Sequence, residues 1–351
     1  MRKAVILGAT GAVGQRFIQL LDGHPDFEVA VLAASGRSAG KTYRDACNWI
    51  VREAAMPPAV ASLPVVECTP EAVRAVCDVD LAFSCLPGDI AGVTEEAFAK
   101  AGIPVFSKAS AHRMDADVPL LVPEINPEHS ALVERQKRER GWDAFITTDP
   151  NCSTTQLVLT LHPLRRLGLA CVRVATMQAL SGAGYPGVAS MDIMDNVVPF
   201  IKGEEEKMML EPQKIFGELE EGSIVPAGMP IDAMCHRVPV LEGHLEAVFV
   251  EFDAPVTRDA VLDAWSGFKG EPLELGLPSA ATPVEFVEGD ARPQHRFDVL
   301  RGKGMTVSTG RLKISGDGLS AQFLCLGHNT IRGAAGEGIL QAEYFNAKKL
   351  F

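Results

Sequence analysis

The chain has 351 residues, above the ~250–300 at which one hydrophobic core usually stops growing, so two joined domains are expected. Its composition, 47% hydrophobic and 22% charged, excludes the disordered and collagen-like classes. The formal charge of −12 argues against nucleic acid or an anionic membrane surface as a partner. No apolar run reaches the ~18–20 residues that span a bilayer and no leader segment is visible, which predicts a cytoplasmic protein.

The first 150 residues alternate between short strands and helical segments. Helical spacing covers Val13–Leu21, and a charged segment, Glu128–Arg140, reads as a second helix. Near-continuous apolar runs, typical of strands buried on both faces of a parallel sheet, occupy Lys3–Leu7, Val29–Ala33, Leu81–Leu86 and Val105–Phe106, and a further strand is predicted at Phe145–Thr148. Residues 1–150 are therefore predicted to form an α/β domain around a parallel sheet.

Longer strands of mixed composition follow and predict a second domain over residues 151–330. They are predicted at Cys171–Ala179, Arg237–Val240, Leu245–Phe252 and Met305–Ile314. Such strands indicate an α+β domain with a mixed, largely antiparallel sheet. The last segment, Ile331–Lys349, reads as a helix, and we expect residues 331–351 to rejoin the first domain.

A glycine-rich turn joins the first strand to the first helix. The pattern Gly-x-x-Gly-x-x-Gly places glycine where a Cβ would block the turn, a bound pyrophosphate or the packing of the helix on the strand. Its residues include Gly8, Thr10, Gly11, Ala12, Val13 and Gly14. This context predicts a Rossmann-type dinucleotide-binding domain; the alternative is a turn that holds no ligand.

The end of the second strand predicts which dinucleotide binds. NAD-binding domains place an acid there against the ribose 2′-hydroxyl, and this segment has none. It offers Ser35, Arg37 and Ser38 instead, which suit a 2′-phosphate through charge-assisted hydrogen bonds. NADP is therefore the predicted cofactor, and use of both NADP and NAD would also satisfy the sequence. The alternative is a solvated basic loop that binds no cofactor.

Cys152 has the setting of a nucleophile. It follows Asn151 at the start of a helix, where the helix dipole and free backbone N–H groups lower a thiol pKa and can hold an oxyanion. The other cysteines suit a role as core thiols, and no cluster of His and Cys has metal-ligand spacing. A thiol nucleophile needs a proton-transfer partner. His244, in a tight turn before a strand, is the preferred candidate by a small margin over His236 and His328. Three other histidines are expected to be surface or helix-flanking residues: His24, His129 and His162.

Together these residues resemble a known family, the aspartate-β-semialdehyde dehydrogenases of the archaeal and fungal branch. The matching stretches run from end to end: Gly8–Phe17, Ala33–Gly40, Phe106–Arg113, Val122–Asn126, Pro150–Thr154, Met177–Tyr185, Glu204–Met208, Arg237–His244 and His328–Gly336. The resemblance implies reversible, NADP-dependent reductive dephosphorylation of L-4-aspartyl phosphate to L-aspartate 4-semialdehyde, on the route to lysine, threonine and methionine. It also implies a thioester on the cysteine, and a homodimer or homotetramer.

The same resemblance implies a role for each site residue. Cys152 is the nucleophile, His244 the general acid/base, Gln178 orients the intermediate and Asn151 helps to hold the oxyanion and phosphate. Arg237 binds the substrate carboxylate, Glu204 its ammonium group, and Lys207 joins Arg113 at the phosphate. Cofactor-side residues beyond the turn and the Arg37 loop are Ser84, Ser107, Ser181, Gly182, Asn329 and Thr330. Lys108 stands where several relatives carry Asn, and its role stays open.

Two other functions fit part of this pattern. Malonyl-CoA reductases share the thioester and hydride chemistry, but their substrate has no amino group for Glu204 to meet. A non-catalytic NADP-binding sensor would keep the fold without needing a nucleophile, base and anion clamp together. Without the resemblance, Glu204–Lys207 would read as a solvated helix face, and Arg113 and Arg237 as surface or ion-pair residues.

Overall fold

The computed structural model describes residues 1–351 and contains two six-stranded sheets. The first is wholly parallel, in the order β3-β2-β1-β4-β5-β6. Its strands are β1 (Arg2–Leu7), β2 (Phe27–Ala34), β3 (Val65–Glu67), β4 (Leu81–Ser84), β5 (Val105–Ser107) and β6 (Ile146–Thr148). The predicted parallel sheet is confirmed. The three residues of β3 are too few to leave a periodic signal, and the sequence analysis missed that strand.

Both faces of this sheet are covered, which explains its continuous apolar strands. Alternate residues of β1 enter different cores: Ile6 packs in the core that contains Phe17 of α1, and Leu7 in the one that contains Phe98 of α5. The helices of this region are α1 (Ala12–Leu21), α2 (Tyr43–Ala46), α3 (Pro58–Ala61), α4 (Pro70–Arg74), α5 (Gly88–Lys100) and α6 (Leu132–Arg140), the last preceded by a 3₁₀ turn at Pro127–Ala131.

The second sheet has the order β10-β7-β11-β14-β13-β12 and is mixed. Its three central pairings are antiparallel, while β10 and β12 join parallel to their neighbours at the edges. The strands are β7 (Leu169–Gln178), β10 (Ile231–Arg237), β11 (His244–Phe252), β12 (Val284–Phe286), β13 (Val307–Ile314) and β14 (Ser320–Gly327). The predicted mixed sheet is confirmed. The strand predicted at Arg237–Val240 is wrong, because β10 ends at Arg237.

Helices cover only one face of this second sheet. Leu157 of α7 (Cys152–Arg165) and Trp265 of α10 (Arg258–Ser266) pack in the core beneath it. On the opposite face, alternate residues of β11 are partly or fully exposed, and Phe249 keeps 47% of its surface accessible. The remaining elements are α8 (Ser190–Ile193), α9 (Glu204–Ile215), α11 (Glu271–Glu274), α12 (His295–Asp298), a hairpin of β8 (Glu218–Glu220) and β9 (Ser223–Val225), and 3₁₀ turns at Leu180–Ala183 and Arg301–Gly304.

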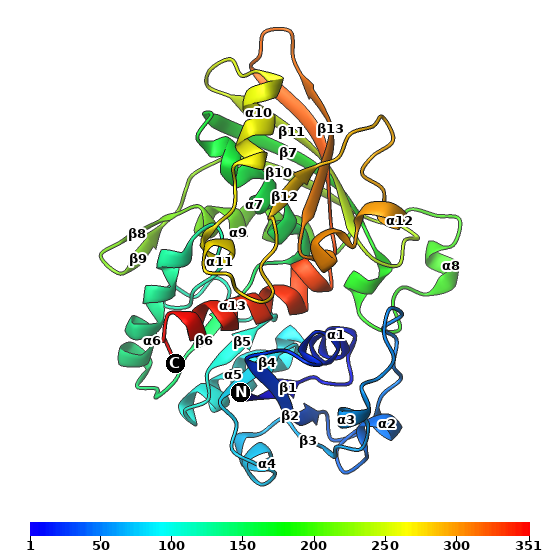
Figure 1. Ribbon diagram of the computed structural model, residues 1–351, viewed down its shortest axis with the longest axis vertical. Helices are drawn as coiled ribbons and strands as arrows, with labels where there is room; N and C mark the ends of the chain where they lie inside the picture. Colours follow the sequence, from blue (N-terminus) through cyan, green and yellow to red (C-terminus); the bar gives the residue numbers. More distant parts are fainter.

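The last helix lies between the two sheets (Figure 1). The segment predicted as one helix begins with a π-helical turn, Ile331–Ala335, and continues as α13 (Gly336–Ala347). Phe345 of α13 packs edge-to-face on Phe106 and at a tilt on Phe145, with centroids 5.6 and 5.1 Å away, in the core that contains Phe17. The C-terminal segment therefore packs on the first sheet, as expected, while the boundary at residues 150 and 151 stays a prediction.

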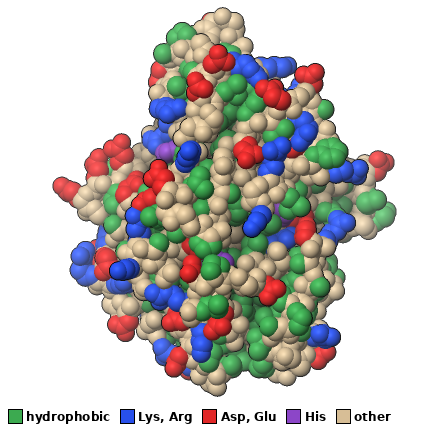
Figure 2. Space-filling model, in the orientation of Figure 1, with side chains coloured by type: hydrophobic (Ala, Val, Ile, Leu, Met, Phe, Trp, Pro, Cys, Tyr) green, Lys and Arg blue, Asp and Glu red, His purple; other side chains and the backbone are tan.

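The surface and the helices add two observations. Acidic and basic side chains are interspersed over the face drawn in Figure 2. No helix is both long enough and apolar enough to cross a membrane.

Substituting Phe345 by Ala tests whether α13 is anchored in the first core. Large-to-small changes of a buried Phe cost about 3–5 kcal/mol, and Phe345 is fully buried. We expect a loss of that size in the free energy of unfolding measured with urea. Ala347→Ser, at an exposed position of α13, is the control. A loss below about 1 kcal/mol for Phe345→Ala, the range of ordinary surface substitutions, would contradict the anchoring.

Candidate active site

The helix that carries Cys152 begins where the sequence predicts. Asn151 caps α7: its Oδ1 accepts hydrogen bonds from the backbone N–H groups of Ser153 (3.0 Å) and Thr154 (3.4 Å). The side-chain amide of Asn151 donates to Glu204 Oε2 (2.9 Å), and its backbone N–H donates to Glu211 Oε2 (2.7 Å). This cap fixes the first turn of α7 and with it the position of Cys152.

His244 is the histidine that meets Cys152. It is the first residue of β11, follows Gly243 in the left-handed region (φ +89°), and places Nε2 3.2 Å from Cys152 Sγ. The backbone N–H of Ala179 donates to Nδ1 (3.0 Å), so the proton of the neutral ring lies on Nε2, facing the sulfur. Of its two rivals, His236 contacts the Thr176 carbonyl and His328 pairs with Glu242.

The pKa expected for the thiol is wrong in direction. Burial, the largest effect, and the charge of Glu204 together raise the pKa of Cys152 to about 12, against opposing effects of Arg113 and Arg237. Burial lowers the pKa of His244 to about 3, assisted by the nearby Arg237 guanidinium. The helix terminus is present, but loss of hydration outweighs it, and the resting pair is a neutral thiol beside a neutral imidazole.

Charged side chains surround this pair, and most are buried and paired. Glu204 Oε1 binds Lys207 Nζ at 2.9 Å, one turn along α9. Burial raises the pKa of Glu204, but Lys207 and Asn151 outweigh it and hold the pKa below its usual value. Glu204 is 8% exposed, so the solvated-face interpretation is wrong for this residue. Arg113, 7% exposed, binds Glu211 at 2.9 Å and is not a surface residue.

Two predicted residues lie beside the reacting pair from the ends of neighbouring strands. Gln178 of β7 pairs with Arg237 of β10, and both are buried. Arg237 Nη1 donates to the Ala179 carbonyl (2.6 Å), whereas the side-chain Nε2 of Gln178 has no partner. A Cβ on Gly182 would lie 2.8 Å from Arg237 Nη1 and 3.1 Å from His244 Cε1, so a side chain there would displace Arg237 or His244. The free Gln178 amide is a donor available to a substrate oxygen.

The glycine-rich turn fits a dinucleotide pyrophosphate. Gly8 has φ +85°, and a Cβ on Gly14 would come within 2.4 Å of the Gly8 carbonyl oxygen. Helix α1 has no side-chain cap at Gly11 and no acid in its first turn. Its N-terminal N–H groups and dipole are thus left for an anion.

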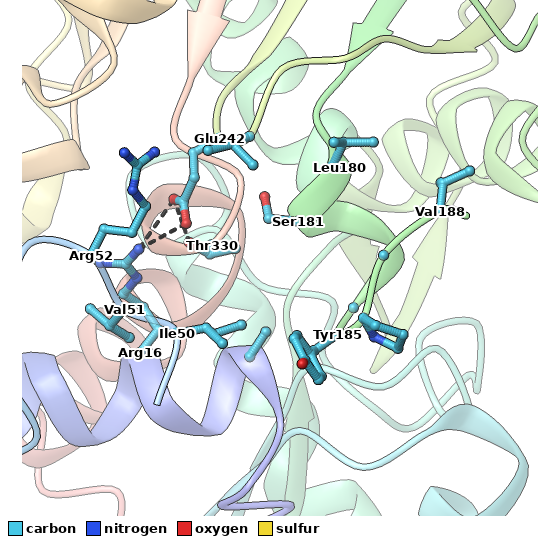
Figure 3. Close-up of a pocket in the computed structure, with 15 residues that line it drawn as sticks. Arg16, Ile50, Val51, Arg52, Leu180, Ser181, Tyr185, Val188, Glu242 and Thr330 are labelled. Carbon is cyan, nitrogen blue, oxygen red and sulfur yellow. Dashed lines mark hydrogen bonds and ion pairs between the residues drawn. The ribbon is translucent and has the colours of Figure 1, made fainter. Parts of the chain in front are cut away.

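A cleft of about 280 Å³ runs from this turn toward the second sheet. Figure 3 shows Arg16 of α1 and Glu242 joined at one side of the cleft, with Tyr185 and Val188 opposite. Arg16 Nη2 and Glu242 Oε1 are 3.1 Å apart, and Asn48 donates to the Tyr185 hydroxyl (3.0 Å). These contacts connect α1 and the loop of Asn48, on the side of the first sheet, to the loops of Tyr185 and Glu242, on the side of the second sheet.

The other predicted cofactor residues fall into three groups. Asn329 donates to Ser181 Oγ (2.8 Å), and Thr330 donates to Glu242 (3.1 Å), beside the cleft. Ser84 and Ser107 are buried and both donate to Glu95 Oε1 (2.6 Å), which fixes the direction of both hydroxyl groups. Ser35 and Arg37 are exposed after β2, and Ser38 is half-buried.

The sequence analysis missed several acids around these groups. Glu67 ends β3, paired with Ala34 at the end of β2, and its Oε1 lies 3.6 Å from where a Cβ on Gly36 would be. Glu211 holds both Arg113 and the Asn151 backbone. Lys108, whose role was open, is buried in an ion pair with Asp149. A pairing between distant segments leaves no local pattern that would have identified these residues.

The three histidines expected at the surface or beside helices are not exposed. His24 and His129 are buried and His162 is half-buried. Each has a specific neighbour: His24 Nε2 lies 2.7 Å from Glu343, His129 Nε2 lies 3.1 Å from the Gly217 carbonyl oxygen, and His162 packs between Phe216 and Phe268. These histidines tie helices and loops together and stand apart from the reacting pair.

Comparison with known proteins now adds to this geometry. A family model described as semialdehyde dehydrogenase, NAD binding domain, matches residues 3–133, and one described as semialdehyde dehydrogenase, dimerisation domain, matches residues 161–332. The chain belongs to the semialdehyde dehydrogenase family. The family predicted from the motifs, the two-domain fold and a nicotinamide-dinucleotide cofactor are confirmed.

Individual relatives cover nearly the whole chain. The chain is 52% identical to an aspartate-semialdehyde dehydrogenase of Methanothermobacter thermautotrophicus, over 97% of this chain and 98% of the relative. It is 42% identical to that of Schizosaccharomyces pombe (98% and 97%) and 40% identical to a malonyl CoA reductase (NADP) of Metallosphaera sedula (97% and 96%). The crystal structure of aspartate semialdehyde dehydrogenase with NADP from Candida albicans superposes with a TM-score of 0.90 at 40% identity, covering 100% of both chains.

Replacing Glu204 by Gln tests the electrostatics of the thiol. Glu204 raises the pKa of Cys152, so its neutralisation shifts the pH profile of Cys152 alkylation by iodoacetamide to lower pH. Each pKa unit corresponds to about tenfold in thiolate fraction at a given pH. Peptide mass spectrometry measures the rate at Cys152, with Glu206→Gln, exposed on the same helix, as the control. An unchanged profile, or one moved to higher pH, would contradict the assigned interaction.

Proposed function

We propose that this protein is an NADP-dependent aspartate-semialdehyde dehydrogenase, which reversibly converts L-4-aspartyl phosphate into L-aspartate 4-semialdehyde and phosphate. The observation that carries the proposal is the 3.2 Å contact between Cys152 Sγ and His244 Nε2, enclosed by buried side chains of both charges beside a dinucleotide cleft. The relatives named for this activity support it. The reaction belongs to the route toward lysine, threonine and methionine.

Cys152 supplies the nucleophile. Its sulfur attacks the acyl carbon, the bond from that carbon to the phosphate oxygen breaks, and a thioester remains on the protein. The thiol proton is accounted for by an exchange at His244 Nε2, which gives its own proton to the departing phosphate oxygen and takes up the proton of the thiol. Asn151 and the unpartnered amide of Gln178 hold and orient the acyl oxygen as it gains charge.

The second half of the reaction releases the aldehyde. When bound, NADPH supplies the hydride that reduces the thioester carbon. The oxygen of the resulting tetrahedral species on Cys152 accepts a hydrogen bond from His244 Nε2–H. As the carbonyl forms and the carbon–sulfur bond breaks, the sulfur takes the Nε2 proton, and water then replaces that proton. The same residues serve the reverse direction.

Charge complementarity selects the substrate in this proposal. Arg237 binds the α-carboxylate, Glu204 the ammonium group, and Lys207 with Arg113 the phosphate. Glu204 is buried, and a substrate ammonium would compensate its charge further. A malonyl-CoA substrate brings no such group, which favours the aspartyl substrate over the activity named for the Metallosphaera sedula relative.

The cofactor is held by the first domain, residues 1–150. Backbone N–H groups of Gly11, Ala12, Val13 and Gly14 would meet the pyrophosphate at the start of α1. Ser35, Arg37 and Ser38 would meet the 2′-phosphate, since Arg37 is exposed and free of any ion pair. Ser181, Gly182, Asn329 and Thr330 lie toward the nicotinamide end, in the proposed catalytic domain at 151–330.

Two copies pair, in this proposal, through the open face of the second sheet. Phe249 and Met234 expose 47% and 61% of their surfaces there, and Ala175, Ala247 and Leu324 form a partly exposed row across the central strands. A second copy would cover this apolar face. The family model over this domain, described as a dimerisation domain, supports the pairing.

Reduction of NADP with L-aspartate 4-semialdehyde, with and without phosphate, tests the function. We expect NADPH formation that requires phosphate, no NADPH oxidation with malonyl-CoA, and turnover abolished in Cys152→Ala, because the acyl group then has no acceptor. Cys235→Ala, a buried core thiol, controls for loss of a cysteine as such. Activity with malonyl-CoA alone would overturn the roles of Glu204 and Lys207. Near-normal turnover in Cys152→Ala would exclude a thioester on Cys152 from the mechanism.

A further inference from the structure

A second pair of polar side chains lies directly behind Cys152 and His244. Gln156 is one turn after Cys152 on α7, and Glu246 is two residues after His244 on β11, so each shares a face with its reactive neighbour. Gln156 is 1% exposed and Glu246 0%. The nucleophile's helix and the histidine's strand are thus linked a second time, behind the reacting atoms.

Gln156 holds the backbone of His244. Its Nε2 donates to the His244 carbonyl oxygen (3.0 Å). The position opposite His244 on β14 is Gly327, where a Cβ would come within 2.4 Å of Gln156 Oε1. The absence of a side chain at Gly327 therefore gives Gln156 the space to reach the first residue of β11.

Glu246 faces no cation. Its strand neighbours are Thr176 on β7 and Cys325 on β14, and Cys325 Sγ donates to Glu246 Oε2 (3.4 Å). The titratable groups facing it are the thiols of Cys325 and Cys235, while α7 presents only the uncharged Gln156 and Thr160. A carboxylate in this position would be an uncompensated buried charge.

Two oxygen atoms in this layer lack a hydrogen-bond donor. They are Oε1 of Gln156 and Oε1 of Glu246, both fully buried. The Gln156 side chain is close enough to the Glu246 carboxyl group for hydrogen bonding with it, like that with Cys325, to lower the pKa of Glu246. Burial outweighs both effects and raises this pKa to about 8. A proton on Glu246 Oε1 would make that atom a hydroxyl donor, and Gln156 Oε1 could accept from it, so that both oxygens gain a partner.

We propose that Glu246 is protonated at neutral pH and forms with Gln156 a positioning pair that holds His244 against Cys152. The carboxyl hydroxyl donates to Gln156 Oε1, and Gln156 Nε2 donates to the His244 carbonyl. Ionisation of Glu246 removes the donor, places a charge behind the imidazole and loosens its placement. The inference rests on the proposed function for the consequence in turnover, but not for the effect on the Cys152 thiol.

Glu246→Gln and Glu246→Leu separate the hydrogen bond from simple space filling. Gln keeps a neutral donor, so we expect kcat within about twofold of wild type at pH 7 and no fall through pH 8, where wild-type kcat declines. Leu removes the donor, and we expect kcat to fall about 10–100-fold with KM within about threefold, as for a small misplacement of a reacting group. Gln156→Leu should lower kcat by a similar factor, and the double variant Gln156→Leu, Glu246→Leu should lower kcat no more than either single variant. Glu274→Gln, at an exposed glutamate of α11, is the control.

Two readouts need no substrate. The alkylation rate of Cys152 by iodoacetamide should show an inflection near pH 8 in wild type that Glu246→Gln lacks. The sign for stability follows from linkage: a carboxyl whose pKa is raised in the folded state contributes stability at low pH that is lost as pH rises toward 8. In urea unfolding, the free energy of unfolding of Glu246→Gln should therefore rise relative to that of wild type between pH 5 and about 8.5.

The outcomes distinguish this inference from the proposed function. An alkylation inflection that disappears in Glu246→Gln supports the positioning pair even if the protein fails to reduce NADP with aspartate semialdehyde. Identical pH profiles of Cys152 alkylation in wild type and Glu246→Gln would overturn the positioning pair. An equal fall in kcat in Glu246→Gln and Glu246→Leu would overturn it as well. If Glu246→Leu does not fold, the pH profiles of Cys152 alkylation in wild type and Glu246→Gln still test the positioning pair.

Discussion

The contact between Cys152 and His244 is the constraint on which the rest of the structure depends. Each residue opens its element, α7 or β11, and 92 positions of chain separate them. Two glycines make the approach possible. A side chain on Gly333, in the π-helical turn, would lie 2.6 Å from the Cys152 Cβ, and one on Gly182 would strike Arg237 and His244. Because the π-helical turn leads directly into α13, packed on the first sheet, the catalytic pair is fixed where the two sheets meet.

Burial governs the electrostatics of this site more than helix geometry does. It raises the pKa of the thiol and lowers that of the imidazole, so neither is charged at rest. Most of the charges nearby are neutralised within the protein, as in Glu204 with Lys207 and Arg113 with Glu211. These charged groups are therefore held in place before any ligand binds, and such preorganisation limits the rearrangement that a reaction requires.

Local patterns predicted most of the fold and part of the site. The apolar strands, the glycine-rich turn and Cys152 at a helix start all leave signals within a few residues of sequence. The choice of His244 among three histidines did not, because strand register across β7, β11 and β14 sets which one meets the thiol. The thiol pKa was predicted in the wrong direction because burial, unlike a helix terminus, is not visible in a short segment. Glu246 was missed for the same reason, since its spacing in β11 is that of any inward-facing residue.

A covalent acyl group on Cys152 is the central claim, and it is directly measurable. Incubation with L-aspartate 4-semialdehyde and NADP in the absence of phosphate should oxidise the aldehyde once and leave the thioester without an acceptor. Intact-mass and peptide mass spectrometry should then find one aspartyl group, on the peptide containing Cys152, and phosphate should release it. An unmodified protein that has nonetheless produced NADPH, or an aspartyl group on any other residue, would contradict the account.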